Sequence, residues 1–202
     1  YFALRVRGIE HFPERGPYII AANHSSHLDA AALLASLCVS LGPAKASQLH
    51  VLGAKDYFFD HRLKGWALSA LLNVVPVDRE DASLASLHMG KNILAQGAPV
   101  AIFPEGTRSR TGQIQEFKPG IGLIAVEAGV PIVPVYIKGA YQALPPGSVF
   151  PRPRPIEVFC GPKIDVDAAG SISQSPKDEL YRQIAAKAYQ AVTSLPQASI
   201  RG

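Results

Sequence analysis

The chain of 202 residues contains only two cysteines, Cys38 and Cys160, which argues against a fold held together by disulfide bonds. Because both lie in apolar runs, we expect two reduced, buried thiols in a cytoplasmic protein. Long hydrophobic runs are missing as well. The uncharged run 66–77 is too short to cross a bilayer, and the run 121–137 contains Glu127 and two prolines. Because no signal peptide or membrane-spanning helix is apparent, any membrane contact is expected to be peripheral or to come from segments outside this chain.

Charge of either sign is also scarce. Charged residues make up 18% of the chain and hydrophobic residues 48%, which excludes a disordered or highly charged protein. The formal net charge of +4 is too small and too scattered to indicate nucleic-acid binding. It suits an anionic small molecule or an anionic membrane surface.

The length fits a single domain, residues 1–202, with its core at about 4–165 and a C-terminal helix at about 176–195. Because the chain begins at Tyr1 without a methionine, we expect it to be a segment of a longer protein. Fusion or partner domains are then expected outside this segment.

Short apolar runs rich in β-branched residues alternate with stretches of helical spacing. This alternation predicts an α/β fold, with a mostly parallel central sheet flanked by helices. Strands are predicted at residues 4–8, 18–22, 48–53, 73–77, 99–103, 132–137 and 156–160. Helices are predicted over about 33–41, ended by Gly42-Pro43, over about 82–96, over about 119–128, and from Ser175-Pro176 to about 195.

Polar clusters follow three of the predicted strands. The sequence NHSSHLD (23–29) follows the second strand, DRED (78–81) the fourth and PEGTRSR (104–110) the fifth. In sheets of this kind, ligands bind beyond the carboxyl ends of the strands. We therefore expect the three clusters to converge on one cleft.

In the first cluster, His24 and Asp29 are five residues apart, a spacing that would turn them roughly 140° apart on one regular helix. They can meet if His24 lies in the turn before a helix and Asp29 in its first turn, with Ser26 as the N-cap. Two other interpretations stay open. Ser26 and Asp29 match a capping box that needs no catalytic role, and His24, His27 and Asp29 could form a metal site.

A histidine–aspartate pair has a specific chemical use. A carboxylate that accepts from one imidazole nitrogen fixes the tautomer and makes the other nitrogen more basic. That nitrogen can remove a proton from a hydroxyl, a step worth about 10²–10⁴-fold in rate. No G-x-S-x-G nucleophile elbow occurs in the chain, so the substrate is expected to supply the attacking oxygen.

The cluster after the fifth strand places four residues at the carboxyl end of that strand: Glu105, Gly106, Thr107 and Arg108. Gly106 lets the backbone approach a ligand, Thr107 offers a hydroxyl, and Arg108 offers a bidentate fork for phosphate. Taken alone, an arginine in this position also fits a plain solvated charge.

Together the clusters resemble the glycerol-phosphate and lysophosphatidate acyltransferase family, whose members carry an N-H-x-x-x-x-D block and an E-G-T-R block. The resemblance covers about residues 4–165, in the family's order. Residues 23–29 are similar to the first block, VVPVDR (74–79) to the second, 105–109 to the third, IVPVYIKG (132–139) to the fourth, and FKPG (117–120) to the segment after the third.

The resemblance implies a glycerol-phosphate acyltransferase-like fold. It also implies transfer of a fatty acyl group from acyl-CoA or acyl carrier protein to the hydroxyl of a phosphate-bearing glycerolipid. The acceptor it favours is 1-acylglycerol-3-phosphate, giving phosphatidate. By position, His24 is the expected general base and Asp29 its orienting partner.

The same resemblance places the acceptor's phosphate against Arg108, helped by Arg79 and Lys118, with Glu105 bracing the site. Gly106 and Thr107 belong to the same binding loop. No metal and no permanently bound cofactor are expected. The uncharged run 66–77 and the pair Phe58-Phe59 are candidates for an apolar acyl groove.

Alternatives remain open at this point. The acceptor could be glycerol-3-phosphate or another lysolipid, and the chain could be a non-catalytic lipid-binding domain or a lipid hydrolase. The expected location is the cytoplasmic face of a membrane, by peripheral attachment.

Overall fold

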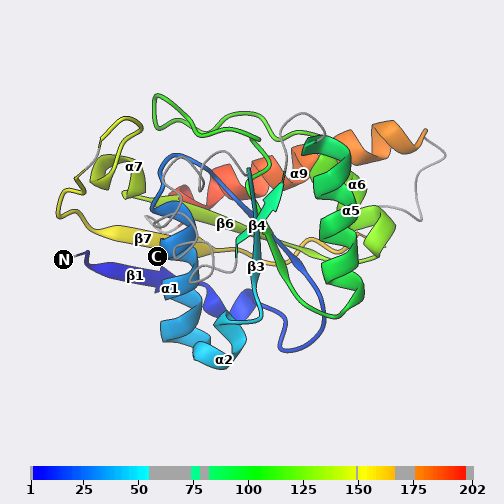
Figure 1. Ribbon diagram of the computed structural model, residues 1–202, viewed down its shortest axis with the longest axis horizontal. Helices are drawn as coiled ribbons and strands as arrows, with labels where there is room; N and C mark the ends of the chain where they lie inside the picture. The colour runs from blue at the N-terminus through cyan, green and yellow to red at the C-terminus, as the bar shows by residue number, and fades with distance from the viewer. Residues whose placement is uncertain (1, 55–73, 78–81, 149, 167–175, 199–202) are drawn as a thin grey trace.

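The computed structural model describes residues 2–54, 74–77, 82–148, 150–166 and 176–198. These residues form a seven-stranded sheet with helices on both faces (Figure 1). The α/β fold predicted from the alternating pattern is confirmed. The strands are β1 (Leu4–Arg7), β2 (Ile19–Ala22), β3 (His50–Ala54), β4 (Val74–Val77), β5 (Val100–Ile102), β6 (Ile132–Lys138) and β7 (Ile156–Cys160).

The helices cover the sheet on both sides because the central strands are apolar on both faces. Successive residues of β2 enter opposite cores: Ile20 and Ala22 pack with α1, whereas Ile19 and Ala21 pack with α5, α6 and α9. The helices are η1 (Ile9–His11), α1 (Asp29–Leu41), α2 (Pro43–Ala46), α5 (Ala82–Ala95), α6 (Gly120–Ala128), α7 (Ala140–Ala143) and α9 (Lys177–Ala198).

The strand order is β1-β7-β6-β2-β5-β3-β4, and every neighbouring pair is parallel except β6 and β7. Strand β2 therefore lies between β5 and β6, and all three run in the same direction. Their carboxyl ends share one edge of the sheet. The clusters at 23–29 and 104–110 begin at this edge, whereas the predicted third cluster, 78–81, lies outside the described residues.

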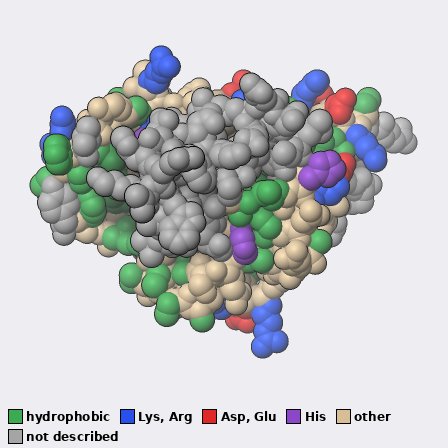
Figure 2. All heavy atoms as spheres, viewed as in Figure 1, with side chains coloured by type: hydrophobic (Ala, Val, Ile, Leu, Met, Phe, Trp, Pro, Cys, Tyr) green, Lys and Arg blue, Asp and Glu red, His purple; other side chains and the backbone are tan. Residues whose placement is uncertain are grey.

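Three short helices, η1, α2 and α7, were not predicted, because three or four residues are too few to show a helical period. Ser175, the predicted cap of the last helix, lies outside the described residues. In the described part of the chain, no helix combines the length and apolar character needed to cross a membrane. On the face drawn in Figure 2, lysine and arginine side chains are scattered around the rim rather than gathered in one patch.

The prediction that both cysteines are buried is wrong for one of them. Cys160 on β7 is buried, and its burial raises the pKa of the thiol to about 12. Cys38 is exposed, because α1 turns Leu33 and Leu37 toward the sheet and the next residue is rotated by about 100°.

Candidate active site

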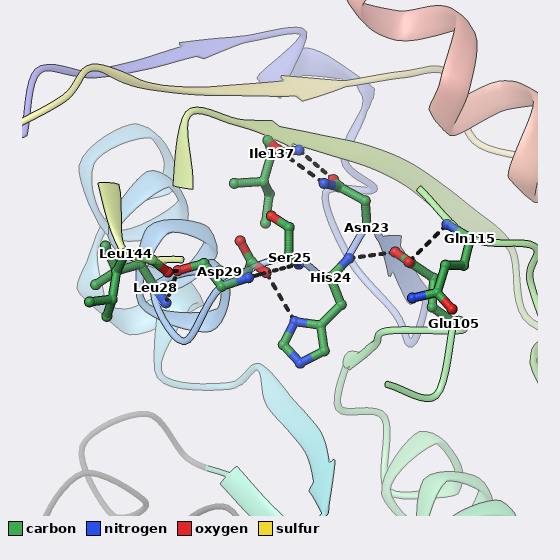
Figure 3. Close-up of polar contacts among 10 residues, drawn as sticks. Asn23, His24, Ser25, Leu28, Asp29, Glu105, Gln115, Ile137 and Leu144 are labelled. Carbon is green, nitrogen blue, oxygen red and sulfur yellow. Dashed lines mark hydrogen bonds and ion pairs between the residues drawn. The ribbon is translucent and has the colours of Figure 1, made fainter. Parts of the chain in front are cut away.

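Strand β2 ends in an amide that ties it to its neighbour β6. The Asn23 side chain donates to the carbonyl of Ile137 at 3.0 Å and accepts from the Ile137 N–H at 2.7 Å (Figure 3). Asn23 is buried, so both bonds are made away from water. The Asn23 side chain thus extends the hydrogen bonding between β2 and β6 beyond the last residue of β2. The sequence showed Asn23 only as part of a motif; its position directly after a buried strand was the available signal.

His24 and Asp29 meet as predicted. Nδ1 of His24 lies 2.9 Å from Oδ2 of Asp29, which also accepts the backbone N–H groups of Ser25 at 2.6 Å and Ser26 at 2.7 Å. Asp29 is the first residue of α1, where the helix dipole and the backbone donors favour a carboxylate. Because a carboxylate oxygen only accepts, Nδ1 of His24 carries the proton.

This arrangement leaves Nε2 of neutral His24 with a lone pair, on the side of the ring that points away from Asp29 in Figure 3. The side chain of His24 is 22% exposed and that of Asp29 is 0% exposed. A substrate can therefore reach the imidazole but not the carboxylate that orients it.

The prediction that Ser26 is the N-cap of the first helix is wrong. The cap residue is Leu28, which makes no side-chain cap bond. The hydroxyl of Ser26 instead accepts the N–H of Leu28 at 3.1 Å and donates to the carbonyl of Leu144 at 2.7 Å. One half of the capping box does form, from Ser26 N–H to Asp29. The same oxygen of Asp29 thus serves both the helix end and the histidine.

The plane of the His24 ring is set by an aromatic neighbour. Phe103, directly after β5, stacks on the imidazole with ring centroids 4.2 Å apart and an interplanar angle of 20°. Stacked rings at this separation attract each other and restrict rotation of the imidazole. The sequence placed Phe103 in a strand and offered no signal for this contact.

Glu105 joins the two loops of the site. Its Oε1 accepts the N–H of His24 at 2.6 Å, and its Oε2 accepts the N–H of Gln115 at 2.9 Å. The residue is 3% exposed, and this burial raises its pKa to about 7, against the lowering effect of the two backbone donors. Asp29 raises it further. Glu105 therefore holds the backbone of His24, and its raised pKa lies near neutral pH. Its predicted role in bracing the phosphate site stays a prediction.

A second bond crosses between the loops beside Arg108. The N–H of Ser109 donates to the carbonyl of His24 at 2.8 Å. Arg108 is half-buried, and its charge is one of the groups that lower the pKa of His27 to about 4, after desolvation and ahead of His24. Arg108 therefore lies on the side of the molecule that holds both histidines.

The tip of the second loop is open to solvent. Gly106 and Thr107 are exposed, and Gly106 adopts φ +72°. A Cβ at Gly106 would lie 2.6 Å from Nζ of Lys118, so the lysine amine folds over this glycine. The N–H of Lys118 donates to the carbonyl of Pro104 at 2.9 Å, which closes the loop behind the tip.

Some predicted elements of the site lie outside the described residues: Arg79, the pair Phe58-Phe59 and the part 66–73 of the candidate acyl groove. For the metal alternative, the residues that the structure does describe include no group of three or more histidine, cysteine, aspartate or glutamate side chains able to hold an ion.

Among the residues that the structure describes, His24 is an oriented base, and no hydroxyl or thiol is hydrogen-bonded to its ring. Ser25 and Ser26, the hydroxyl residues next to His24, are 4% and 0% exposed, and the Ser26 hydroxyl is committed to Leu144. A base beside cationic groups, at the carboxyl edge of a parallel sheet, is suited to removing a proton from an anionic substrate's hydroxyl.

A family model described as Acyltransferase matches residues 3–138, about two thirds of the chain. The chain therefore belongs to the acyltransferase family, as its motifs predicted. It is similar to the chloroplastic 1-acyl-sn-glycerol-3-phosphate acyltransferase BAT2 of Brassica napus, with 34% identity over 151 residues, 73% of this chain and 41% of the relative.

Two further relatives carry the same activity in their names. The human 1-acyl-sn-glycerol-3-phosphate acyltransferase alpha is 34% identical over 142 residues, 69% of this chain and 46% of that protein. The 1-acyl-sn-glycerol-3-phosphate acyltransferase of Pseudomonas aeruginosa is 34% identical over 168 residues, 82% of this chain and 60% of that protein. The chain thus spans about half the length of the curated relatives it matches.

Among solved structures, the fold is similar to the 1-acyl-sn-glycerophosphate (LPA) acyltransferase PlsC of Thermotoga maritima. The TM-score is 0.71 at 25% identity, and the likeness covers 98% of this chain and 73% of that one. The predicted glycerol-phosphate acyltransferase-like fold is confirmed.

Proposed function

We propose that this chain is the catalytic part of an enzyme that acylates 1-acylglycerol-3-phosphate to phosphatidate. The donor is a fatty acyl thioester, of coenzyme A or acyl carrier protein. The observation that carries the proposal is the His24–Asp29 pair, hydrogen-bonded through its backbone to the loop that bears Arg108. The names of the similar proteins support the choice of acceptor over glycerol-3-phosphate or another lysolipid.

In the proposed reaction, Nε2 of His24 removes the proton from the acceptor's free hydroxyl. The oxygen forms a bond to the thioester carbonyl carbon, and the tetrahedral oxyanion collapses with cleavage of the carbon–sulfur bond. The imidazolium returns its proton to the departing thiolate, so the base is regenerated. Asp29 stabilises the imidazolium and holds the ring in the productive tautomer.

Direct attack by the acceptor is favoured over an acyl-enzyme intermediate. The serines nearest the base are buried, and the chain has no nucleophile elbow. Both substrates are therefore bound at once. Because the thioester is already activated, alignment of the two reacting groups supplies much of the acceleration.

The acceptor's phosphate is assigned to the cationic side of the site. Arg108 provides the bidentate fork, and Lys118, whose amine lies over Gly106, provides a second positive charge. We assign Arg79 to the same role from its motif. Thr107 and the backbone at Gly106 border this position, and Glu105 keeps the loop in register with His24.

A lysophospholipid acceptor, which carries a fatty acyl chain, is located in a membrane. We therefore propose that the protein works as a peripheral protein on the cytoplasmic face of a membrane. A single domain within a longer protein is the arrangement we propose for the chain.

Release of free thiol, followed with a colour reagent, tests the function. We expect acyl-CoA or acyl carrier protein to release thiol only when 1-acylglycerol-3-phosphate is present, with phosphatidate found by mass spectrometry. A panel of other lysolipids and glycerol-3-phosphate then defines the acceptor. Equal release without any acceptor would show a hydrolase, and no release with any pair would show a binding domain; either result would overturn the proposal.

A further inference from the structure

The connection from β6 to β7 carries side chains that the reaction does not use. Residues 144–155 include five prolines, and Phe150, Arg152 and Arg154 are exposed in it. Phe150 is 83% exposed, the largest value among the exposed large hydrophobic side chains of the described residues. Neither arginine forms an ion pair with another residue in the part of the chain that the structure describes. We call residues 150–154 the proline-arginine segment.

This segment has a firm base. The N–H of Arg152 donates to the carbonyl of Ala143, the last residue of α7, at 2.7 Å. Where the segment ends, the carbonyl of Pro155 lies against Gly139 so closely that a Cβ there would be 2.1 Å from the oxygen. Prolines fix φ, and the backbone bond closes the loop, so little conformational freedom is left to lose on binding.

The same base contacts both loops of the candidate active site. Leu144, directly after α7, accepts the hydroxyl of Ser26 at 2.7 Å. Tyr141 on α7 donates its hydroxyl to the carbonyl of Arg110 at 2.9 Å, and its ring lies over Gly112. Figure 1 shows α7 and the connection to β7 together at one end of the molecule. The proline-arginine segment therefore stands at the carboxyl edge of the sheet, on the side of the catalytic loops.

In the view of Figure 2, hydrophobic side chains lie at the left end of the molecule, near α7 and the start of β7, with basic side-chain atoms beside them at the edge. An exposed aromatic ring followed in the chain by two exposed guanidinium groups matches a bilayer surface, where the ring enters the headgroup boundary and the cations meet lipid phosphates. A single ring offers far less area than the roughly 800 Å² per partner of a stable protein interface.

We propose that the proline-arginine segment docks the protein on an anionic lipid bilayer, with Phe150 inserted at the headgroup boundary and Arg152 and Arg154 against lipid phosphates. Docking at this edge presents the catalytic loops to the membrane that holds the acceptor. The biological purpose of this docking rests on the proposed function. The contacts that support the docking surface do not depend on the proposed acyl transfer.

Sedimentation with lipid vesicles tests the docking. The chain is mixed with vesicles of phosphatidylcholine alone, or of phosphatidylcholine with phosphatidylglycerol. We expect stronger partitioning onto the anionic vesicles. Replacing both arginines (Arg152→Ala with Arg154→Ala) is expected to weaken it about 25-fold. Phe150→Ser is expected to weaken it about tenfold on both kinds of vesicle.

Matched controls lie elsewhere on the surface. Val39 on α1 is 80% exposed, close to the 83% of Phe150, so Val39→Ser removes a smaller apolar group of similar exposure. Lys45 on α2 and Lys187 on α9 are exposed, so Lys45→Ala with Lys187→Ala makes the same change of charge. These controls should bind vesicles as the unaltered chain does. Equal weakening of vesicle binding by the control substitutions would overturn the proposal. Equal binding to both kinds of vesicle, or binding to neither kind, would also overturn it and would point to a protein partner.

A second assay separates docking from catalysis. Short-chain, fully dissolved acyl-CoA and lysophosphatidate are supplied without vesicles, and thiol release is expected to be the same for all these variants. If the unaltered chain shows no such turnover, the proposed function fails while the vesicle result stands. If turnover is normal and the proline-arginine variants bind vesicles undiminished, the docking proposal alone fails.

Discussion

The loop after β2 and the loop after β5 meet at one site but are held in different ways. In the first loop, four polar residues are buried: Asn23, Ser25, Ser26 and Asp29. The side chains of Asn23, Ser26 and Asp29 form hydrogen bonds to backbone groups, and one of the donors to Asp29 is the N–H of Ser25. In the second, the tip at 106–107 is exposed. Arg108 beside it is half-buried, with Nη1 of its guanidinium buried, and Lys118 is exposed.

The difference matches the role that we propose for each loop. A general base acts only within hydrogen-bond reach and at a defined angle, so small displacements are costly in rate. A phosphate is held by charges that tolerate movement, and flexible lysine and arginine side chains can adapt to it. Substitutions in the two loops test this difference, and the strongest loss is expected at His24.

His24→Ala removes the base from the rigid loop. We expect kcat/KM to fall by about 1,000-fold or more, with the unfolding free energy lowered by no more than about 1 kcal/mol, the value of the lost ring stacking. Steady-state thiol release and urea unfolding measure the two effects. His88→Ala, an exposed histidine on α5, is the control and should change neither. Full activity in the His24 variant would exclude the dyad mechanism.

Asp29→Asn should damage both rate and fold. Its Oδ2 accepts three hydrogen bonds, so we expect kcat to fall about 100-fold and the unfolding free energy to drop by about 2 kcal/mol. Asp178→Asn in the exposed first turn of α9 is the matched control. A loss of rate without any loss of stability would show that the carboxylate does not hold the loop.

Glu105→Gln should change the dependence of stability on pH. Burial raises the pKa of Glu105 from 4.5 to about 7, so the folded state holds this proton more tightly than the unfolded chain does. Its contribution to stability is fully present below pH 4.5 and is lost as pH rises toward 7, roughly 3 kcal/mol in all.

We therefore expect the unfolding free energy of the Gln variant to fall less between these pH values than that of the unaltered chain. Urea unfolding at several pH values gives the difference. Parallel curves would show that Glu105 is ionised throughout this range.

Arg108→Ala tests the adaptable loop. We expect KM for the phosphate-bearing acceptor to rise about 10- to 100-fold, the value of one or two charge-assisted hydrogen bonds, with a smaller change in kcat. Lys118→Ala should raise this KM by a smaller factor. Lys45→Ala on α2 is the control and should leave it unchanged. A fall in kcat at unchanged KM would instead assign Arg108 to the transition state.

Gly106→Ala should have the smallest effect. The new methyl group would displace the Lys118 amine, and φ +72° is strained for alanine, so we expect about 1 kcal/mol of lost stability and a KM change like that of Lys118→Ala. Gly97→Ala is a close control, because φ is +85° there and no atom lies within 4 Å of its Cβ position. Equal acceptor KM values in the two glycine variants would show that the position of Lys118 is irrelevant.

Much of this architecture was predictable from local patterns. All seven strands and four longer helices follow from apolar periodicity, because each central strand must bury both faces and each longer helix one. The chemistry of His24, Asp29 and Arg108 follows from residue type and from their place after strands. The catalytic and binding roles themselves stay predictions until the variants are measured.

Other features could not be read from the chain. The antiparallel pairing of β6 with β7 depends on the path of the connection between them. Ser26 looked like a helix cap, but Leu144, 118 residues away, takes its hydroxyl. The stacking of Phe103 on His24 and the bond from the His24 N–H to Glu105 also join segments about 80 residues apart, and nothing local marks them.

Local sequence specifies which groups are present, which strands are buried and which motifs follow them, because these depend on side-chain chemistry and on periods of two and 3.6 residues. Which of these groups touch depends on the tertiary structure. Placing β5 next to β2 brings a glutamate to the backbone of His24 and a serine N–H to its carbonyl. Such contacts arise from the packing of whole strands and helices, which no single stretch of sequence contains.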